Sequence, residues 1–251
     1  MRYNIVCSRL GRIRLSFSDL THTTNDCKYI FIYGYLKTEL DGGFMSTKSF
    51  FSSKRVTGCA VLLALVIVLQ AFGGSIAIGV VQLNFTLIPI VLGAVLYGPL
   101  VGGLLGFACG VVVLVQVILG LVPFYAIIWT YTPVLAALTC VVKTTVAGLV
   151  SGWLFQLLSK KNTTTALFVA SGAVPVINTA LFIVGCLFMR DSVAVFQNTL
   201  SNFVGMNIFV FILVGLVTFN FFIELAINLI VAPTLRQVIG VVDKRFRKEE
   251  L

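Results

Sequence analysis

The sequence predicts an all-α polytopic membrane protein, built as a bundle of six transmembrane helices. Of its 251 residues, 59% are hydrophobic and 11% are charged, whereas soluble domains carry about 25% charged residues. Long apolar runs follow one another from Val56 to Ile239 with few charges between them. The basic residues gather beside these runs, so the net charge of +9 suits a membrane surface better than nucleic acid.

Each predicted span is an apolar run bounded by glycine, proline or basic residues. A helix that crosses the hydrocarbon core needs about 20 apolar residues, and shorter or broken helices occur inside bundles. Gly73-Gly74 ends the first run, and Tyr97-Gly98-Pro99 closes the second, which is short and contains Pro89. Gly120 to Pro123 breaks the chain after the third. The six spans are predicted at residues 56–75, 83–96, 100–119, 131–158, 165–189 and 202–232.

Loop charge predicts the orientation of the bundle. Basic residues precede the first span, connect the fourth to the fifth, and follow the sixth. With six spans these three places lie on one side, which the positive-inside rule makes cytoplasmic, and both termini are then cytoplasmic. The residues concerned are Lys48, Lys54, Arg55, Lys160, Lys161, Arg236, Lys244, Arg245, Arg247 and Lys248.

The chain divides into three parts by composition. Residues 1–44 are polar and aperiodic, and Met45 then begins a short basic lead into the first span. We expect Met45 to be the true start and residues 1–44 to be a misannotated extension; the alternative is a disordered cytoplasmic tail. Residues 45–240 form the predicted membrane domain, and residues 241–251 form a charged cytoplasmic tail.

Two charged residues lie deep inside the predicted spans. A charge at the centre of a bilayer costs about 2.5–3.5 kcal/mol, so such residues usually face a partner, a cavity or a ligand. At 1.5 Å per residue, Lys143, Asn178 and Asn220 lie roughly 21–24 Å from the basic end of their helices, and Glu224 lies roughly 18 Å from it. Four polar residues from three helices thus share one layer.

The polar layer has two interpretations. In the first it is a ligand pocket, where Lys143 engages a carboxylate, phosphate or carbonyl while Asn178, Asn220 and Glu224 make directed hydrogen bonds. In the second, Lys143 and Glu224 form a buried ion pair, and the asparagines join the helices. Within the first interpretation, Glu224 could also couple transport to protons.

Aromatic residues precede the fourth span. Trp129 is the residue that we expect to stack on a planar ligand; an interfacial aromatic belt is the alternative. The other members of the group are Phe124, Tyr125 and Tyr131.

Motifs for catalysis and for metal or nucleotide binding are missing from the sequence. There is no GxxxxGK[ST] loop to hold nucleotide phosphates. The single histidine, His22, lies outside the spans, and no Ser/His/Asp or Cys/His arrangement is visible. We therefore predict no enzyme activity, no metal and no cofactor. Four of the six cysteines fall in apolar runs, where they are expected to be buried thiols.

Small residues recur one helical turn apart in three predicted spans. Such small-xxx-small pairs let helices approach closely. The first span contains Ala60 and Ala64. For the two glycine pairs, Gly106/Gly110 and Gly148/Gly152, we expect internal packing.

One segment carries a family resemblance. Residues 83–99 read Leu-Asn-Phe-Thr-Leu-Ile-Pro-Ile-Val-Leu-Gly-Ala-Val-Leu-Tyr-Gly-Pro, and Val-Gly-Gly-Leu-Leu-Gly follows at 101–106. Together with six spans, a basic amino terminus and the pair of Ala60 and Ala64, this segment resembles the substrate-binding S components of bacterial energy-coupling factor (ECF) vitamin transporters. The resemblance covers roughly Arg55 to Arg236.

The resemblance implies a function and partners. An S component in the bacterial plasma membrane captures a water-soluble vitamin outside the cell. It then associates with a T component and two ATPases that drive uptake. In this family the first-helix alanines dock onto the T component, a role that passes here to Ala60 and Ala64. Pantothenate, flavin and other vitamins stay open. The alternatives are a stand-alone proton-coupled secondary transporter and a membrane scaffold that binds no small molecule.

Overall fold

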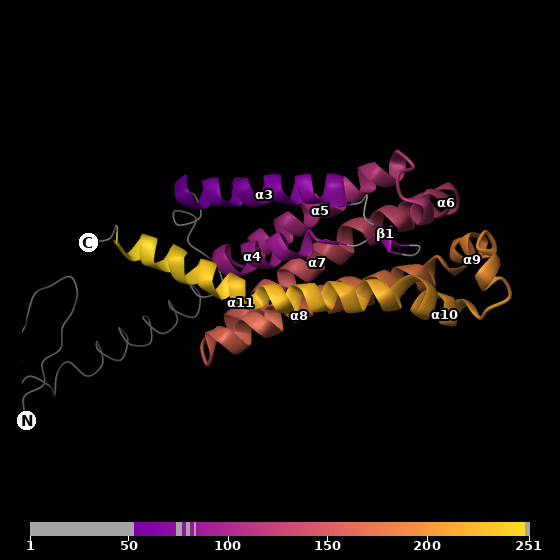
Figure 1. Ribbon diagram of the computed structural model, residues 1–251. Coiled ribbons are helices and arrows are strands. Elements are labelled where there is room, and N and C mark those ends of the chain that lie inside the picture. Colours follow the sequence, from indigo (N-terminus) through magenta and orange to yellow (C-terminus); the bar gives the residue numbers. More distant parts are fainter. Residues whose placement is uncertain (1–52, 74–76, 79–80, 83, 249–251) are drawn as a thin grey trace, which may run out of the picture. The chain divides into compact units, whose positions relative to one another are not determined.

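The computed structural model describes residues 53–73, 77–78, 81–82 and 84–248 (Figure 1). The predicted extension at residues 1–44 lies outside these residues. By compactness the chain divides into residues 1–56 and 57–251. The second unit contains nearly all of the described elements, and the following account concerns that unit.

The described elements are almost entirely helical. A two-residue antiparallel hairpin pairs Ala77 with Gln82 and Ile78 with Val81. The elements in chain order are α3 (Ser53–Gly73), β1 (Ala77–Ile78), β2 (Val81–Gln82), α4 (Leu87–Tyr97), α5 (Pro99–Ile118), α6 (Pro123–Tyr131), α7 (Pro133–Ser159), α8 (Thr163–Phe188), α9 (Arg190–Asn198), η2 (Ser201–Phe203), α10 (Ile208–Val210), η3 (Phe211–Val217) and α11 (Thr218–Lys248).

Five stretches of helix within the described residues are long and apolar enough to cross a membrane. They cover Arg55–Phe72, Pro99–Ile118, Pro133–Ser159, Thr163–Phe188 and Ile208–Gly240. The predicted all-α, multi-pass membrane architecture is therefore confirmed. The second predicted span, residues 83–96, corresponds to α4 (Leu87–Tyr97), a helix of only 11 residues. At roughly 16 Å this helix is shorter than the hydrocarbon core, and the structure does not confirm a count of six full spans.

The last helix begins later and ends later than predicted. It was expected from residue 202, but Gly205 has a φ of +78°, and the Asn207 side chain accepts a hydrogen bond from the Phe209 N–H at 2.9 Å. This cap sets the start at Ile208. The first turns, Phe211–Val217, form a π-helix. The helix then continues to Lys248, so most of the predicted 241–251 tail is helical.

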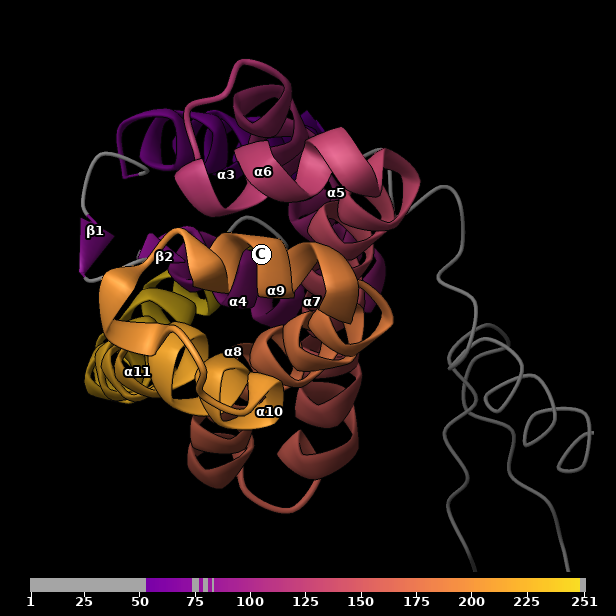
Figure 2. The ribbon, with the colours of Figure 1, turned by 90° about the vertical axis from the view of Figure 1, so that its right-hand side faces the viewer.

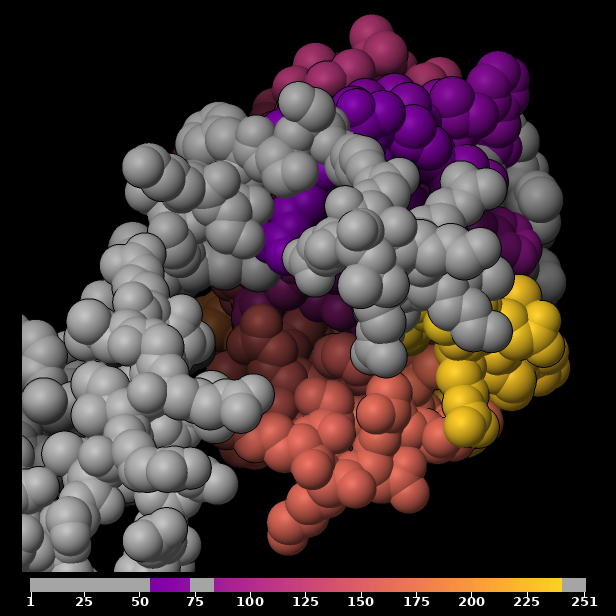
Figure 3. All heavy atoms as spheres, turned by 90° about the vertical axis from the view of Figure 1, so that its left-hand side faces the viewer, coloured from indigo at the N-terminus to yellow at the C-terminus, as the bar shows by residue number. Residues whose placement is uncertain are grey.

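The bundle has two distinct ends. The α4–α5 turn and the end of α7 meet at one of them, since a Cβ on Gly98 would lie 3.4 Å from the Gln156 amide nitrogen. Lys160 and Lys161 follow directly, at the α7–α8 turn. Figure 3 views this end, where that turn and part of α11 reach the surface. Helices α5 and α8 both begin at this end of the bundle and run to the opposite end. The elements α6, α9 and the β1–β2 hairpin therefore lie toward the opposite end (Figure 2).

Helix α7 lies between α5 and α8 and contacts both along its length. On the α5 side glycines bring the two backbones together. A Cβ on Gly106 would lie 2.7 Å from the Thr144 carbonyl carbon, and one on Gly102 would lie 2.6 Å from the Gly148 carbonyl oxygen. The internal packing expected for the Gly106/Gly110 and Gly148/Gly152 pairs is thus confirmed.

We expect Gly106→Ala to lower the melting temperature of the purified protein. The added methyl group would collide with the α7 backbone, and overpacking costs about 1–3 kcal/mol. In a chain of this size each kcal/mol shifts the melting temperature by about 2–4 °C. The control is Gly172→Ala, where the nearest atom, Leu229 Cδ2, lies 3.5 Å from the new Cβ. Circular dichroism during heating in detergent compares the two; equal melting temperatures would contradict this packing.

Helix α3 packs against the bundle through a narrow stripe of buried side chains. Leu62, Val66 and Gln70, spaced four apart, are buried, whereas Ala60 and Ala64 are exposed. A stripe at this spacing covers one face of a helix. The small-residue pair therefore lies outside the core of the bundle, on a surface that a second membrane protein could contact.

Candidate ligand-binding site

Lys143 occupies the middle of α7 and is 8% exposed. Its Nζ lies 5.1 Å from the centroid of the Phe182 ring and 5.7 Å from that of the Tyr125 ring. Contacts of this kind stabilise a buried ammonium by about 0.5–2 kcal/mol. In the described part of the chain, no ion pair joins Lys143 to Glu224, and the Arg190–Asp191 ion pair is exposed and involves neither residue. The aromatic rings thus take the place of the counter-ion that the second interpretation required.

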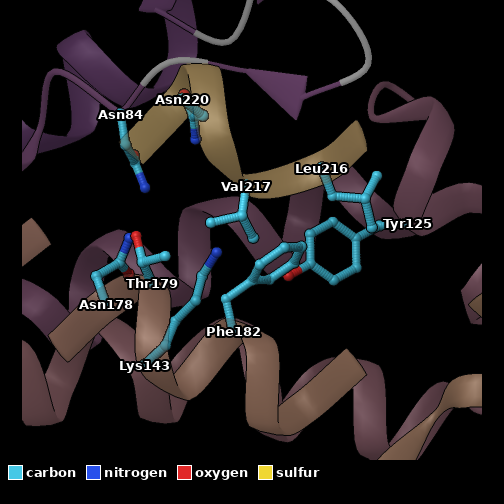
Figure 4. Close-up of a pocket in the computed structure, with 9 residues that line it drawn as sticks. All are labelled: Asn84, Tyr125, Lys143, Asn178, Thr179, Phe182, Leu216, Val217 and Asn220. Carbon is cyan, nitrogen blue, oxygen red and sulfur yellow. The ribbon is translucent and has the colours of Figure 1, made fainter. Parts of the chain in front are cut away.

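A small cavity lies beside the Lys143 ammonium (Figure 4). Its volume is about 40 Å³, enough for water molecules but too small for a vitamin. Residues from α6, α7, α8 and the η3–α11 helix meet around it, joined by one residue from the segment before α4. The lining residues are Asn84, Tyr125, Lys143, Asn178, Thr179, Phe182, Leu216, Val217 and Asn220.

The structure brings together three of the residues predicted from the polar layer. Lys143, Asn178 and Asn220 all line the cavity. Trp129 is half-buried on α6 and is not among the described lining residues, so its contact with a ligand stays a prediction. Tyr125, one turn earlier on the same helix, supplies an aromatic wall instead.

Glu224 lies behind the wall of the cavity and is hydrogen-bonded to two of the residues that form it. Its Oε1 accepts the Asn84 backbone N–H at 3.0 Å and the Asn220 amide N–H at 3.2 Å. The carboxylate is 3% exposed, and its Oε2 has no hydrogen-bond partner. The Asn228 amide donates to the Glu224 carbonyl at 2.8 Å. Glu224 therefore positions Asn84 and Asn220 rather than lining the main cavity.

The nitrogen atoms of three side chains point into the same space. The Asn84 Oδ1 accepts a hydrogen bond from the Thr86 hydroxyl at 3.0 Å. The amide nitrogen of Asn84 therefore faces the cavity (Figure 4). The Asn178 Oδ1 is enclosed without a partner, while its nitrogen faces the cavity, as does the Lys143 ammonium (Figure 4). The three side chains come from different elements, and together they make the cavity rich in hydrogen-bond donors.

A second buried polar cluster holds Asn84 in place. The Gln70 side-chain amide donates to Gln116 Oε1 at 3.1 Å, and the Gln116 side-chain amide donates to the backbone carbonyl of Gln70 at 3.1 Å. The Thr86 hydroxyl lies 3.3 Å from Gln70 Oε1 and 3.1 Å from Cys109 Sγ. This cluster connects α3 and α5 to the segment that carries Asn84. Cys109, Cys140 and Cys186 are buried, as predicted, whereas Cys59, the fourth cysteine in an apolar run, is only half-buried.

Aromatic rings close the cavity on the side of α6 and α9. The Phe124 ring packs edge-on against Tyr125, Phe182 and Phe196, with centroid distances of 5.0, 5.7 and 5.1 Å. Beyond them, the Gln197 amide donates to the carbonyls of Phe203 and Met206 at 2.7 and 2.8 Å. The cavity is therefore separated from this end of the bundle by a packed aromatic layer.

The chain matches the family model described as "ECF transporter, substrate-specific component" over residues 54–236. The chain belongs to this family. The match includes every residue that lines the cavity, and it bears out the resemblance that the sequence carries. Members of this substrate-specific component family are transporter components, not enzymes. No curated protein matches the chain. Among the described residues, no group of His, Cys, Asp and Glu could hold a metal ion.

Proposed function

We propose that this S component captures a water-soluble vitamin or a related small molecule outside the cell for ATP-driven uptake. The observation that carries the proposal is Lys143, a buried cation held by aromatic rings beside an amide-lined cavity. Charges inside membrane helices are expensive and mark ligand paths by default. A binding site of this kind needs few polar groups in an apolar setting, which is what surrounds Lys143.

The proposed setting is the bacterial plasma membrane, with both termini in the cytoplasm. The end that carries Lys160 and Lys161 would then face the cytoplasm by the positive-inside rule, and the aromatic layer of α6 and α9 would face outward. In this arrangement α4 and the segment before it act as the sixth membrane element. Asn178, Asn220 and Glu224 complete the proposed site with Lys143, and Trp129 lies on the outward side.

The proposed partners are a T component and two ATPase subunits. The chain has no loop for nucleotide phosphates, so the energy has to come from other subunits. Ala60 and Ala64 are exposed on α3 and spaced by one turn, a pattern that lets a partner helix approach closely. We propose that the T component docks there.

The first test is a pull-down of the tagged full chain from its native membranes in mild detergent. Mass spectrometry would then identify both the proteins and the small molecules that are retained. We expect a T component, two ATPases and a bound small molecule. Recovery of the chain alone, together with uptake that survives ATP depletion, would reject the proposal.

Glu224 favours a second candidate, a stand-alone proton-coupled transporter. The carboxylate is buried, has no cationic partner among the described residues, and leaves Oε2 without a hydrogen bond. Buried carboxylates in membrane helices often belong to proton relays. Uptake in cells separates the candidates: a proton-coupled carrier stops when an ionophore dissipates the proton gradient at constant ATP, whereas the ECF subunit continues and stops on ATP depletion.

A further inference from the structure

We propose that the cavity selects a monoanionic ligand, namely a carboxylate carried on a flat ring. The inference rests on the proposed function of ligand capture and narrows the class of ligand. It follows from the polarity of the groups that face the cavity, from their net charge and from the shape of the apolar wall.

The polarity comes from the three nitrogen donors. Lys143, Asn84 and Asn178 direct N–H groups into one space (Figure 4), while the Asn178 Oδ1 is turned away from it and enclosed. A carboxylate has two oxygens that accept about four hydrogen bonds, and it donates none when ionised. It therefore complements this set of donors, whereas an ammonium or amidinium group would meet donors on three sides.

Glu224 engages two further donors of the cavity wall. Because its carboxylate accepts the Asn220 amide N–H and the Asn84 backbone N–H, it keeps the nitrogen of Asn220 turned toward itself. A carboxylate accepts hydrogen bonds only, so this contact fixes the orientation of the Asn220 amide. Its Oδ1 is then buried without a hydrogen-bond partner, and Asn220 adds no free donor to the three that face the cavity. Donors of the wall thus engage one oxygen of Glu224, Oε1, while Oε2 has no hydrogen-bond partner.

The net charge of the cavity lining limits the ligand to a single negative charge. Lys143 is the only cationic side chain among the described residues that line the cavity. One carboxylate neutralises it. A phosphate would bring a second negative charge into a buried site that also has Glu224 behind its wall, and buried charges without partners are costly. Arginine, the usual bidentate partner of phosphate, is missing from the described lining.

The apolar wall favours a flat ring. Phe182 and Tyr125 line the cavity beside the ammonium, and Leu216 and Val217 face them from the η3 segment. Aromatic side chains pack well against a flat ring in edge-on or offset-stacked contacts. The volume of about 40 Å³ means that a ring enters only if lining side chains move. Leu216 and Val217 belong to a π-helical turn, a geometry that is frequent at functional sites.

The test uses three probes with one ring and different charges: benzoate, benzamide and benzylammonium. Isothermal titration of the purified full chain in detergent measures their affinities, with detergent alone as the blank. We expect benzoate to bind at least about tenfold more tightly than benzamide, and benzylammonium not to bind. Equal affinities, tighter binding of benzylammonium, or no binding of benzoate by the folded protein would overturn the inference.

Two variants locate the selectivity. Lys143→Met keeps the length of the side chain and removes its charge, so the preference for benzoate should vanish. Asn178→Asp is isosteric and replaces an N–H donor with a carboxylate oxygen, so benzoate binding should be lost and benzylammonium binding should appear. Lys160→Met and Asn198→Asp make the same changes at exposed positions and should leave the three affinities unchanged. A folded Lys143→Met protein that still prefers benzoate would refute the assignment.

The failure of this inference is distinguishable from failure of the proposed function. A chain that recovers a T component and ATPases but prefers benzylammonium keeps its function and loses the carboxylate assignment. A chain that recovers no partners and supports no uptake loses the function, whatever its affinity for benzoate. Mass spectrometry of the compound released by denaturing the native protein adds an independent check, because that compound should contain a carboxylate.

Discussion

Ala64→Leu is expected to abolish transport while leaving ligand binding intact. Ala64 and Ala60 lie one turn apart on the exposed side of α3, and close helix approach in membranes depends on small side chains. A leucine there would hold a partner helix away. The bundle itself should be unaffected, since α3 packs through Leu62, Val66 and Gln70 on another face.

Three measurements test this expectation. A pull-down reports the T component and the ATPases, cellular uptake reports transport, and titration with the compound released from the native protein reports binding. Only the third should match the wild type. Ala180→Leu is the control, because it makes the same change at an exposed alanine of α8 and should preserve all three. Normal transport by the Ala64→Leu protein would exclude Ala60 and Ala64 from the docking surface.

Lys143→Ala is expected to weaken binding of the released compound at least about tenfold, or about 1.4 kcal/mol. The substitution removes the one cation of the described cavity lining and two ring contacts that hold it. Hydrogen bonds to charged groups contribute about 1.5–3 kcal/mol each, so the loss of one is sufficient for this effect.

Titration of folded protein measures the change, with Lys160→Ala as control because Lys160 is exposed at the α7–α8 turn. Circular dichroism before titration separates loss of binding from loss of fold. Unchanged affinity in a folded Lys143→Ala protein would exclude Lys143 from the site. It would also refute the carboxylate inference.

The cavity could be predicted only in part from spacing along the chain. Lys143, Asn178 and Asn220 stand out because each is polar inside an apolar run, and counting residues from the basic ends puts them at one depth. Asn84 has no such signal: it lies in a turn next to the hairpin, and its place at the cavity depends on a backbone hydrogen bond to Glu224, 140 residues away. Phe182, Leu216 and Val217 are apolar like their neighbours, so nothing in the sequence marks them.

The presence of Tyr125 rather than Trp129 in the described cavity lining has a simple geometric reason. Both residues lie in an aromatic group before α7, but the sequence does not show that Pro123–Tyr131 forms a separate helix. The orientation of that helix buries Phe124 and Tyr125 against Phe182 and leaves Trp129 half-buried. Side-chain direction around a short helix is set by what it packs against.

The sequence by itself determined the membrane class, the helical architecture, the family and the depth of the polar layer. These follow from composition, apolar run length and a local motif, all of which are properties of continuous segments. The tertiary structure alone decided that α4 is a short helix after a polar turn. It also decided that Lys143 lies over aromatic rings instead of pairing with Glu224, and that Glu224 orients the wall of the cavity. Each of these depends on contacts between helices distant in sequence, which the period of a single helix does not encode.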